Sequence, residues 1–183
     1  MMLQYGAVTL RRIEYRDMEF LRNLINDPQI ALSVVDFGFP VSSRQQNEWF
    51  ETVLPHENAE RFIIESGEHA VGSLVAAKID AENGTGEVGY KVLPEHQGHG
   101  YAADAVRAVL AYLFLEKGLQ CVCAYHLDGN KASMRVLEKA GFVFEGILRK
   151  AVYRNGSRID LVSWSVNRSN YLQKAGVADA AAE

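Results

Sequence analysis

A glycine-rich turn between a strand-like run and a helix-like run is the feature that most constrains this chain. The segment reads Gly86-Glu-Val-Gly-Tyr-Lys-Val-Leu-Pro-Glu-His-Gln-Gly-His-Gly-Tyr-Ala102. The first N–H groups of a helix have no intrahelical partner and attract anions, and glycine lets a pyrophosphate approach them closely. The turn therefore predicts a site for a phosphorylated carrier or a nucleotide.

The spacing within the turn separates the known kinds of phosphate site. A P-loop requires Gly-Lys-Ser/Thr, which this turn lacks. The dinucleotide fingerprint G-x-G-x-x-G is met only in a degenerate form, with Ala103 at the third glycine position, and the strand before it starts no repeated strand–helix–strand pattern. The pattern that fits is Q/R-x-x-G-x-G/A, here Gln97-Gly98-His99-Gly100-Tyr101-Ala102.

Composition limits the class of protein. The 183 residues are 48% hydrophobic, which suits one domain, and we expect it over residues 1–172 with a flexible, Ala-rich tail at 173–183. The formal net charge of −4, with no basic run, argues against nucleic-acid binding, and we expect neither a membrane span nor an export signal. Cys121 and Cys123 are expected to be reduced thiols in a cytoplasmic protein, and no metal site is indicated.

Hydrophobic periodicity predicts alternating strands and helices. Asp17 is expected to cap the first helix and Pro28 to stop it, while Ser43 and Gln46 resemble a capping box for the second. The strand–helix–strand order predicts a mixed sheet with helices on both faces. Strand signals cover residues 8–13, 61–65, 71–79, 86–93, 121–127, 142–153 and 158–166, and helix signals cover 17–27, 43–53, 100–117 and 131–140.

The motifs together resemble the GNAT superfamily of N-acetyltransferases. The glycine turn resembles its acetyl-CoA loop, and Asn130-Lys-Ala-Ser133, followed by a helix and Gly141-Phe142, looks like its N-x-x-S element. Glu145-Gly-Ile-Leu-Arg149 and Asn155-Gly156 are similar to the branch that acetylates ribosomal-protein N-termini and to its spermidine and amino-sugar relatives. Over residues 8–167, the resemblance implies a GNAT fold of the mixed α/β (α+β) class. Its central sheet would have six to seven mostly antiparallel strands, a splayed parallel pair and helices on both faces.

The resemblance also implies acetyl-CoA as cosubstrate, without a metal. The pantetheine arm would lie between strands 86–93 and 121–127, against the main chain of Val92 and Leu93. Asn130 would hold the pantetheine or thioester region, and the N–H of Val92 would polarise the thioester carbonyl. The implied pyrophosphate contacts are Gln97, Gly98, His99, Gly100, Tyr101 and Ala102.

Two residues are candidates for the chemistry of acetyl transfer. Glu87 could remove the amine proton directly or through water, although a solvated carboxylate or an ion-pair partner is an equally good interpretation. Ser133 could protonate or hydrogen-bond the departing sulfur, or could simply satisfy backbone groups at a helix start. Many family members carry a Tyr seven residues after the Asn, but this chain has Leu137 there, which weakens the polyamine interpretation.

The acceptor side is less constrained by the sequence. Asp36, Trp49, Tyr90 and Tyr153 are candidate substrate contacts, with packing as the alternative for the aromatic residues. We predict an acetyl-CoA-dependent N-acetyltransferase acting on a primary amine, a protein N-terminus first, by direct attack in a ternary complex. The alternatives are an amino sugar, aminoglycoside or polyamine acceptor, or a catalytically silent CoA-binding module. A homodimer is a further expectation.

Overall fold

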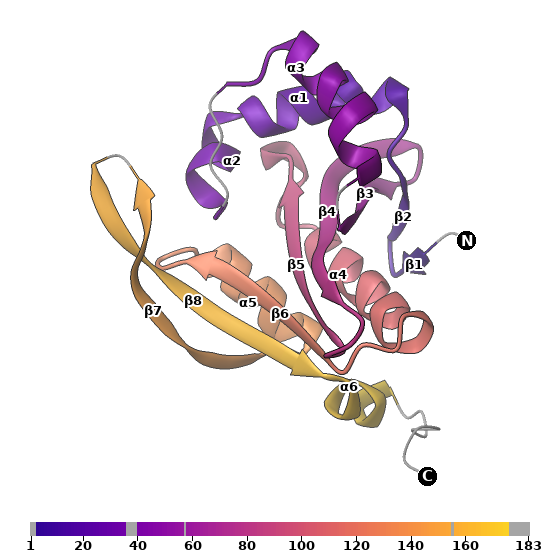
Figure 1. The fold of residues 1–183 in the computed structure, drawn as a ribbon, viewed down its shortest axis with the longest axis vertical. Coiled ribbons are helices and arrows are strands. Elements are labelled where there is room, and N and C mark those ends of the chain that lie inside the picture. Colours follow the sequence, from indigo (N-terminus) through magenta and orange to yellow (C-terminus); the bar gives the residue numbers. More distant parts are fainter. Residues whose placement is uncertain (1–2, 36–39, 57, 155, 176–183) are drawn as a thin grey trace.

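One eight-stranded sheet forms the centre of the computed structural model, which describes residues 3–35, 40–56, 58–154 and 156–175 (Figure 1). Its strands lie in the order β1-β2-β3-β4-β5-β6-β8-β7. In this described part β5 and β6 are parallel and every other neighbouring pair is antiparallel, which confirms the predicted fold class. The strands are β1 (Leu3–Tyr5), β2 (Val8–Arg12), β3 (Ala59–Ser66), β4 (His69–Asp80), β5 (Thr85–Val92), β6 (Cys121–Leu127), β7 (Val143–Arg154) and β8 (Ser157–Asn167).

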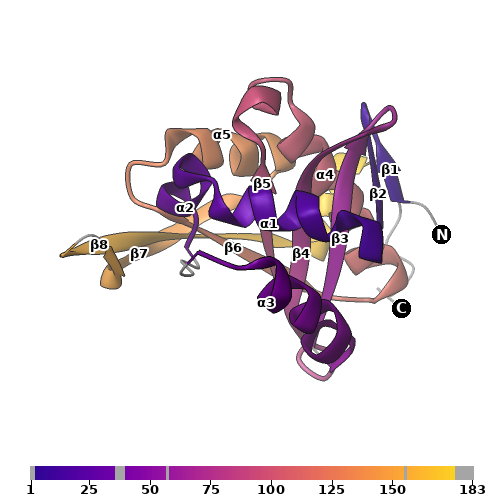
Figure 2. The same ribbon diagram turned by 90° about the horizontal axis from the view of Figure 1, so that it is seen from above.

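Helices cover both faces of the sheet (Figure 2). The pair α4 and α5 lies on one face, and α1 lies on the other with α2 and α3 beside it. No helix in the described ranges combines the length and apolar composition that a bilayer crossing requires. The helices are α1 (Met18–Asn26), α2 (Pro28–Ser33), α3 (Ser43–Glu48), α4 (Tyr101–Ala111), α5 (Lys131–Ala140) and α6 (Arg168–Ala175), with π turns continuing α3 over Trp49–Val53 and α4 over Tyr112–Glu116.

Two hydrophobic clusters hold these layers together. The larger one joins the sheet to α4 and α5, where Leu110, Leu113 and Phe114 are fully buried. The smaller one packs α1 and α2 against Ile63 on the opposite face of the sheet. Successive side chains along a strand point to opposite faces of the sheet, so they alternate between the cluster under α4 and α5 and the cluster under α1.

Some helix boundaries differ from the sequence-based prediction. Pro28 does end α1, but it also begins α2, because its fixed φ suits a first helical position and Asp27 accepts hydrogen bonds from the next turn. The capping box lies one residue earlier than predicted, at Ser42 and Gln45.

Two elements at the ends of the chain were not predicted. β1 brings the sheet to eight strands rather than six or seven. Helix α6 buries Leu172 beyond the last predicted strand. The expected tail from residue 173 falls largely outside the described residues.

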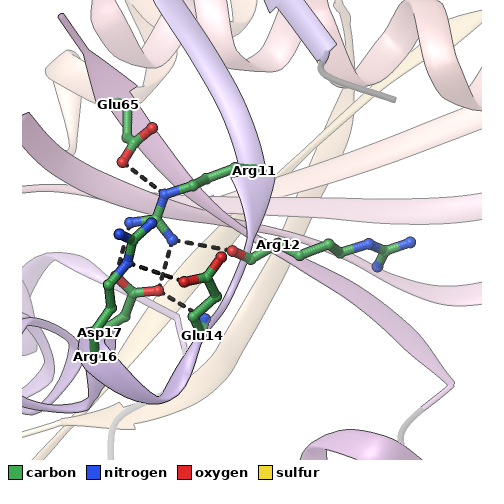
Figure 3. A network of polar contacts seen from close by, with 6 residues as sticks. All are labelled: Arg11, Arg12, Glu14, Arg16, Asp17 and Glu65. Carbon is green, nitrogen blue, oxygen red and sulfur yellow. Dashed lines mark hydrogen bonds and ion pairs between the residues drawn. The ribbon is translucent and has the colours of Figure 1, made fainter. Parts of the chain in front are cut away.

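An ion-pair network fixes the start of α1 to the sheet (Figure 3). Arg11 of β2 donates from its two terminal nitrogens to the oxygens of Asp17, at 2.7 and 2.8 Å, and from Nε to Glu65 of β3 at 2.6 Å. Asp17 is the N-cap residue of α1, as predicted, but its side chain accepts from the N–H of Glu14 at 2.7 Å and makes no capping bond to α1. Burial would raise the pKa of Asp17, but the bonds from Arg11 and from the Glu14 N–H hold it below its usual value.

Replacing Asp17 should therefore destabilise the fold. In Asp17→Asn the partly buried guanidinium of Arg11 loses one of its two carboxylate partners, so we expect the free energy of unfolding to fall by about 2 kcal/mol, measured by urea denaturation at pH 7. The pKa of Asp17 is lower in the folded state than in the unfolded state. The difference in unfolding free energy between the wild type and Asp17→Asn should therefore be complete above the unfolded-state pKa of about 4, and it should shrink as the pH falls through the folded-state pKa.

The matched control is Glu19→Gln, which removes an exposed carboxylate from the same helix. Glu19 lies 3.9 Å from Arg22 and its side chain is 81% exposed, so its loss should change the unfolding free energy by less than about 0.5 kcal/mol. An equal effect of the two substitutions would contradict the anchoring role of Asp17.

Candidate functional site

The parallel pair β5 and β6 comes apart part-way along its length. Pairing runs from Thr85 with Cys121 to Val88 with Ala124, and within the described residues it goes no further. Beyond that point β5 continues over residues 89–92 and β6 over residues 125–127, and Figure 1 shows the two strands diverging. We call the region between these two ends the split. It confirms the splayed parallel pair that the family resemblance implied.

The main chain at the end of β5 faces the split. The N–H of Leu93 donates to the carbonyl of Val71 in β4, so this N–H points away from the split. Since successive N–H groups of a strand point to opposite sides, the N–H and C=O of Val92 point toward the split. The Val92 carbonyl accepts from Gln97 Nε2 at 3.0 Å, which ties the glycine turn to the strand.

The glycine turn ends at the N-terminus of α4. Gly98 and Gly100 have φ of 82° and 87°, in the left-handed region that favours glycine, and a Cβ at either would meet no atom within 4 Å. Gly100 is the N-cap of α4, and its carbonyl accepts from Asp104. The first N–H groups of α4 have no intrahelical partner, and the two glycines before them leave room for a ligand, which is the arrangement that a diphosphate requires.

A pair of hydroxyl groups links β5 to α5 at the split. Tyr90 Oη lies 2.8 Å from Ser133 Oγ and 3.3 Å from the Ser133 carbonyl oxygen. Burial raises the pKa of Tyr90 to about 12, although its hydrogen bond with Ser133 opposes that shift. The phenol therefore stays protonated at neutral pH and is a hydrogen-bond donor. Sequence reasoning placed both residues near the substrates but did not predict their contact.

The side chain of Asn130 already has partners at both ends of its carboxamide. Its Oδ1 caps α5 by accepting from the N–H of Ser133 at 3.0 Å, and its Nδ2 donates to the carbonyl of Ser33 at 3.0 Å. Asn130 thus connects α5 to the end of α2 across the split. Its contact with pantetheine stays a prediction.

Glu87, the predicted base, is in an ion pair. Lys78 Nζ lies 2.9 Å from its Oε1, with the two side chains 75% and 27% exposed. Lys78 has φ of 49°, a left-handed conformation that is uncommon outside glycine, at an irregularity in the β4–β5 pairing. No sequence signal pointed to Lys78, because a backbone irregularity of this kind depends on the neighbouring strand.

A cavity of 1310 Å³ brings most of the predicted site residues together. It extends from the glycine turn along the split and under α1 and α3. Described residues of its lining include Trp49, Glu87, Tyr90, Val92, Gln97, Gly98, Gly100, Tyr101, Ala102, Asn130 and Ser133.

Four predicted residues lie elsewhere or cannot be placed. Leu93 packs in the smaller hydrophobic cluster, and the ring of His99 stacks on Tyr101 at 5.4 Å. Tyr153 is 60% exposed with the guanidinium of Arg158 over its ring, and is not among the lining residues. Asp36 lies outside the described residues.

The charges of the cavity lining are mostly positive. Glu87 is the single carboxylate among its described residues, against five cationic side chains. Arg135 and Lys139 come from α5. The other three come from strands, and the five are Arg61, Lys78, Lys91, Arg135 and Lys139.

Comparison with known proteins decides the family. Residues 7–143 match the model of the acetyltransferase (GNAT) domain. The chain belongs to the GNAT acetyltransferase family. It is therefore an acetyl-CoA-dependent N-acetyltransferase.

Individual relatives agree with the family assignment. The chain is 30% identical to the "SPbeta prophage-derived uncharacterized N-acetyltransferase YokL" of Bacillus subtilis, over 90% of this chain and 92% of that protein. It is 32% identical to the "Putative ribosomal N-acetyltransferase YdaF" of the same organism, over 87% and 90%. A spermidine N-acetyltransferase from Vibrio cholerae, crystallised with CoA and spermine, superposes with a TM-score of 0.84 at 26% identity, covering 91% and 98%.

The glycine turn offers a direct test of the cofactor site. We expect Gly100→Glu to weaken acetyl-CoA binding at least about 100-fold in calorimetry, because a carboxylate would stand where the diphosphate belongs. The control is Gly67→Glu in the β3–β4 turn, where φ is 61° and a Cβ again meets no atom within 4 Å. This variant has a similar backbone strain, and its acetyl-CoA affinity should stay at the wild-type level. Unchanged affinity in Gly100→Glu would remove the turn from the binding site.

Proposed function

We propose that the chain acetylates the N-terminal α-amine of a protein or peptide, by direct attack of the amine on acetyl-CoA in a ternary complex. The observation that carries this choice is the shortage of carboxylates in the cavity lining: Glu87 is the single one among its described residues, and it is ion-paired with Lys78.

The residues present fit acetyl-CoA. The diphosphate would lie at the N-terminus of α4, where the turn from Gln97 to Gly100 leaves room and the helix dipole favours negative charge. Arg135 and Lys139 add positive charge to the same cavity. The pantetheine arm would occupy the split, where the N–H of Val92 is directed and can polarise the thioester carbonyl.

The hydroxyl pair is suited to the departure of the thiolate. Tyr90 stays protonated, because burial raises its pKa to about 12, and can donate to Ser133 Oγ at 2.8 Å. The hydroxyl hydrogen of Ser133 is then available for the sulfur. Leu137, at the position of the family's usual Tyr, is fully buried, so the phenol comes from β5 instead.

The acceptor has to suit a described lining that is short of carboxylates. A polyamine or lysine amine has a pKa near 10, so removing its proton at pH 7 costs about 4 kcal/mol, whereas an α-amine near pKa 8 costs about 1.4 kcal/mol. The carboxylate of Glu87 is already engaged by Lys78 Nζ at 2.9 Å. The lining also offers a multiply charged polyamine no carboxylate among its described residues other than the ion-paired Glu87, so the α-amine is favoured on both counts.

The raised pKa of Cys123 supports direct attack of the amine on the thioester. Burial, followed by the neighbouring Cys121, raises the pKa of Cys123 to about 11. A thiol that stays protonated is a poor nucleophile, which supports transfer without an acyl-enzyme.

Polyamine acetylation is the second candidate. It is favoured by the similarity to the Vibrio cholerae spermidine N-acetyltransferase. The two candidates predict different acceptor preferences.

An amine panel separates them. We expect kcat/KM for peptides with a free N-terminus to exceed that for spermidine at least about tenfold at pH 7.5, measured by thiol release from acetyl-CoA. The control is the same peptide with a blocked N-terminus and an internal lysine, which should be inactive. A higher kcat/KM for spermidine or an aminoglycoside would overturn the preferred acceptor and leave the acetyl-transfer activity in place.

Substitutions in the hydroxyl pair test the leaving-group step. Ser133→Ala should lower kcat about 100-fold, within the usual range for a proton-transfer group, while the Kd for CoA stays within about threefold. Tyr90→Phe should lower kcat less, by about tenfold, because Ser133 remains. Ser157→Ala, an exposed β8 serine outside the described cavity lining, serves as control. Wild-type turnover in Ser133→Ala would exclude Ser133 from the mechanism.

A further inference from the structure

The cavity has lining residues on both faces of the sheet at the split. Tyr90 and Val92 pack in the larger hydrophobic cluster and line it from the face that carries α4 and α5. Glu87 and Lys91 alternate with them along β5, so they line it from the face that carries α1. Because the pantetheine arm would fill the split and the turn before α4 would hold the diphosphate, the α1 face is left for the amine. Lining residues on that face are therefore the ones that an acceptor would meet.

Two leucines from the β7–β8 hairpin line the cavity on the α1 face. Val162 of β8 belongs to the larger cluster, so its neighbour Leu161 points to the α1 face. Leu148 of β7 is paired with Leu161, and paired residues share a face. Both leucines are lining residues, and Leu148 is 50% exposed. An apolar surface is therefore open to the acceptor side of the cavity.

These leucines lie at about the level of the Val92 N–H along the split. Val92 is four residues beyond Val88, the last paired residue of β5. Leu127 is three residues beyond Ala124, the last paired residue of β6, and is itself paired with Leu161. With a rise of about 3.3 Å per residue, the two positions differ by only one residue along the strands. An amine that attacks a carbonyl held by the Val92 N–H therefore has its own substituents level with the leucines.

The end of α2 completes this apolar surface. Val34 and Val35 follow α2 and line the same cavity. Arg154, at the end of β7, donates to the carbonyls of both valines, so the hairpin and the end of α2 are held together. We call Val34, Val35, Leu148 and Leu161 the apolar wall. These four side chains cannot hydrogen-bond, so a charged or polar group placed against them would lose water without gaining a partner.

We propose that the apolar wall binds the side chain next to the reacting amine, so that the preferred acceptor is a peptide whose first residue is apolar, such as leucine or methionine. This inference rests on the proposed function, because it specifies the residue that carries the α-amine. An apolar first side chain would remove its own surface and that of the wall from water, which favours binding. An aspartate or arginine in the same place would be desolvated without compensation.

Peptides that differ only in their first residue test this selection. The set begins with leucine, methionine, serine, aspartate or arginine, and arginine is chosen because its charge comes without a second reactive amine. For the wild-type chain we expect kcat/KM to be at least about tenfold higher for the leucine and methionine peptides than for the other three. The rate is measured by thiol release from acetyl-CoA.

Variants of Leu148 test whether the wall makes the selection. Leu148→Ser should lower the leucine-to-serine ratio of kcat/KM at least about threefold, and Leu148→Glu should raise the arginine-to-leucine ratio at least about tenfold. The Kd for CoA should stay at the wild-type level in both. Ile147→Ser and Ile147→Glu are matched controls, because Ile147 is 52% exposed but is paired with Val162 on the opposite face and is not among the described lining residues. The control variants should keep the wild-type ratios.

Other results overturn the inference. A wild-type leucine-to-serine ratio within about twofold would do so, as would ratios that the Leu148 and Ile147 variants change equally. An equal loss of rate for all peptides in the Leu148 variants would assign Leu148 a structural role instead. These results would leave N-terminal acetylation itself in place. If no peptide were acetylated while another amine was, the proposed acceptor would be refuted and the inference with it.

Discussion

The loss of pairing between β5 and β6 after Val88 and Ala124 is the constraint from which the site follows. A strand beyond its last partner has N–H and C=O groups that need another partner, and a buried group without one is costly. At the end of β5 the Val92 carbonyl is satisfied by Gln97, and its N–H faces the split. The same divergence leaves Tyr90 facing a cavity rather than the neighbouring strand. An extended, amide-containing arm is the ligand best matched to such a place.

Charge within the cavity says more about the substrates than the charge of the whole chain. The sequence has a formal net charge of −4, yet five cationic side chains and one carboxylate line the described cavity. The acidic residues are used elsewhere: Asp17 and Glu65 hold Arg11, and Glu60 pairs with Lys117 at 2.7 Å. A single attractive patch for anions inside a mildly acidic molecule suits a phosphorylated cofactor.

Local sequence signals predicted the elements around the cofactor, and contacts between distant elements could not be predicted. The glycine turn, the helix after Asn130 and most strand positions depend on residues close together in the chain, and the structure agrees with them. The Lys78–Glu87 pair depends on a left-handed residue at an irregularity between two strands. The Tyr90–Ser133 contact joins residues 43 positions apart, so no local pattern indicates it. Helix α6 was missed because only Leu172 of its short sequence is deeply buried.

The hydroxyl pair also links the two diverging strands. Tyr90 reaches from β5 to the first turn of α5, and Asn130 reaches from the same turn to Ser33 at the end of α2. Because α5 follows β6 in the chain, the first of these bonds connects the two diverging strands through the start of the helix, and the second adds α2 to the same contact. A Tyr at the position of Leu137 could donate to the sulfur, but Leu137 is fully buried in the main hydrophobic cluster. With the phenol on β5, the apolar contact of Leu137 in α5 stays intact, and Tyr90 supports Ser133 from the opposite strand.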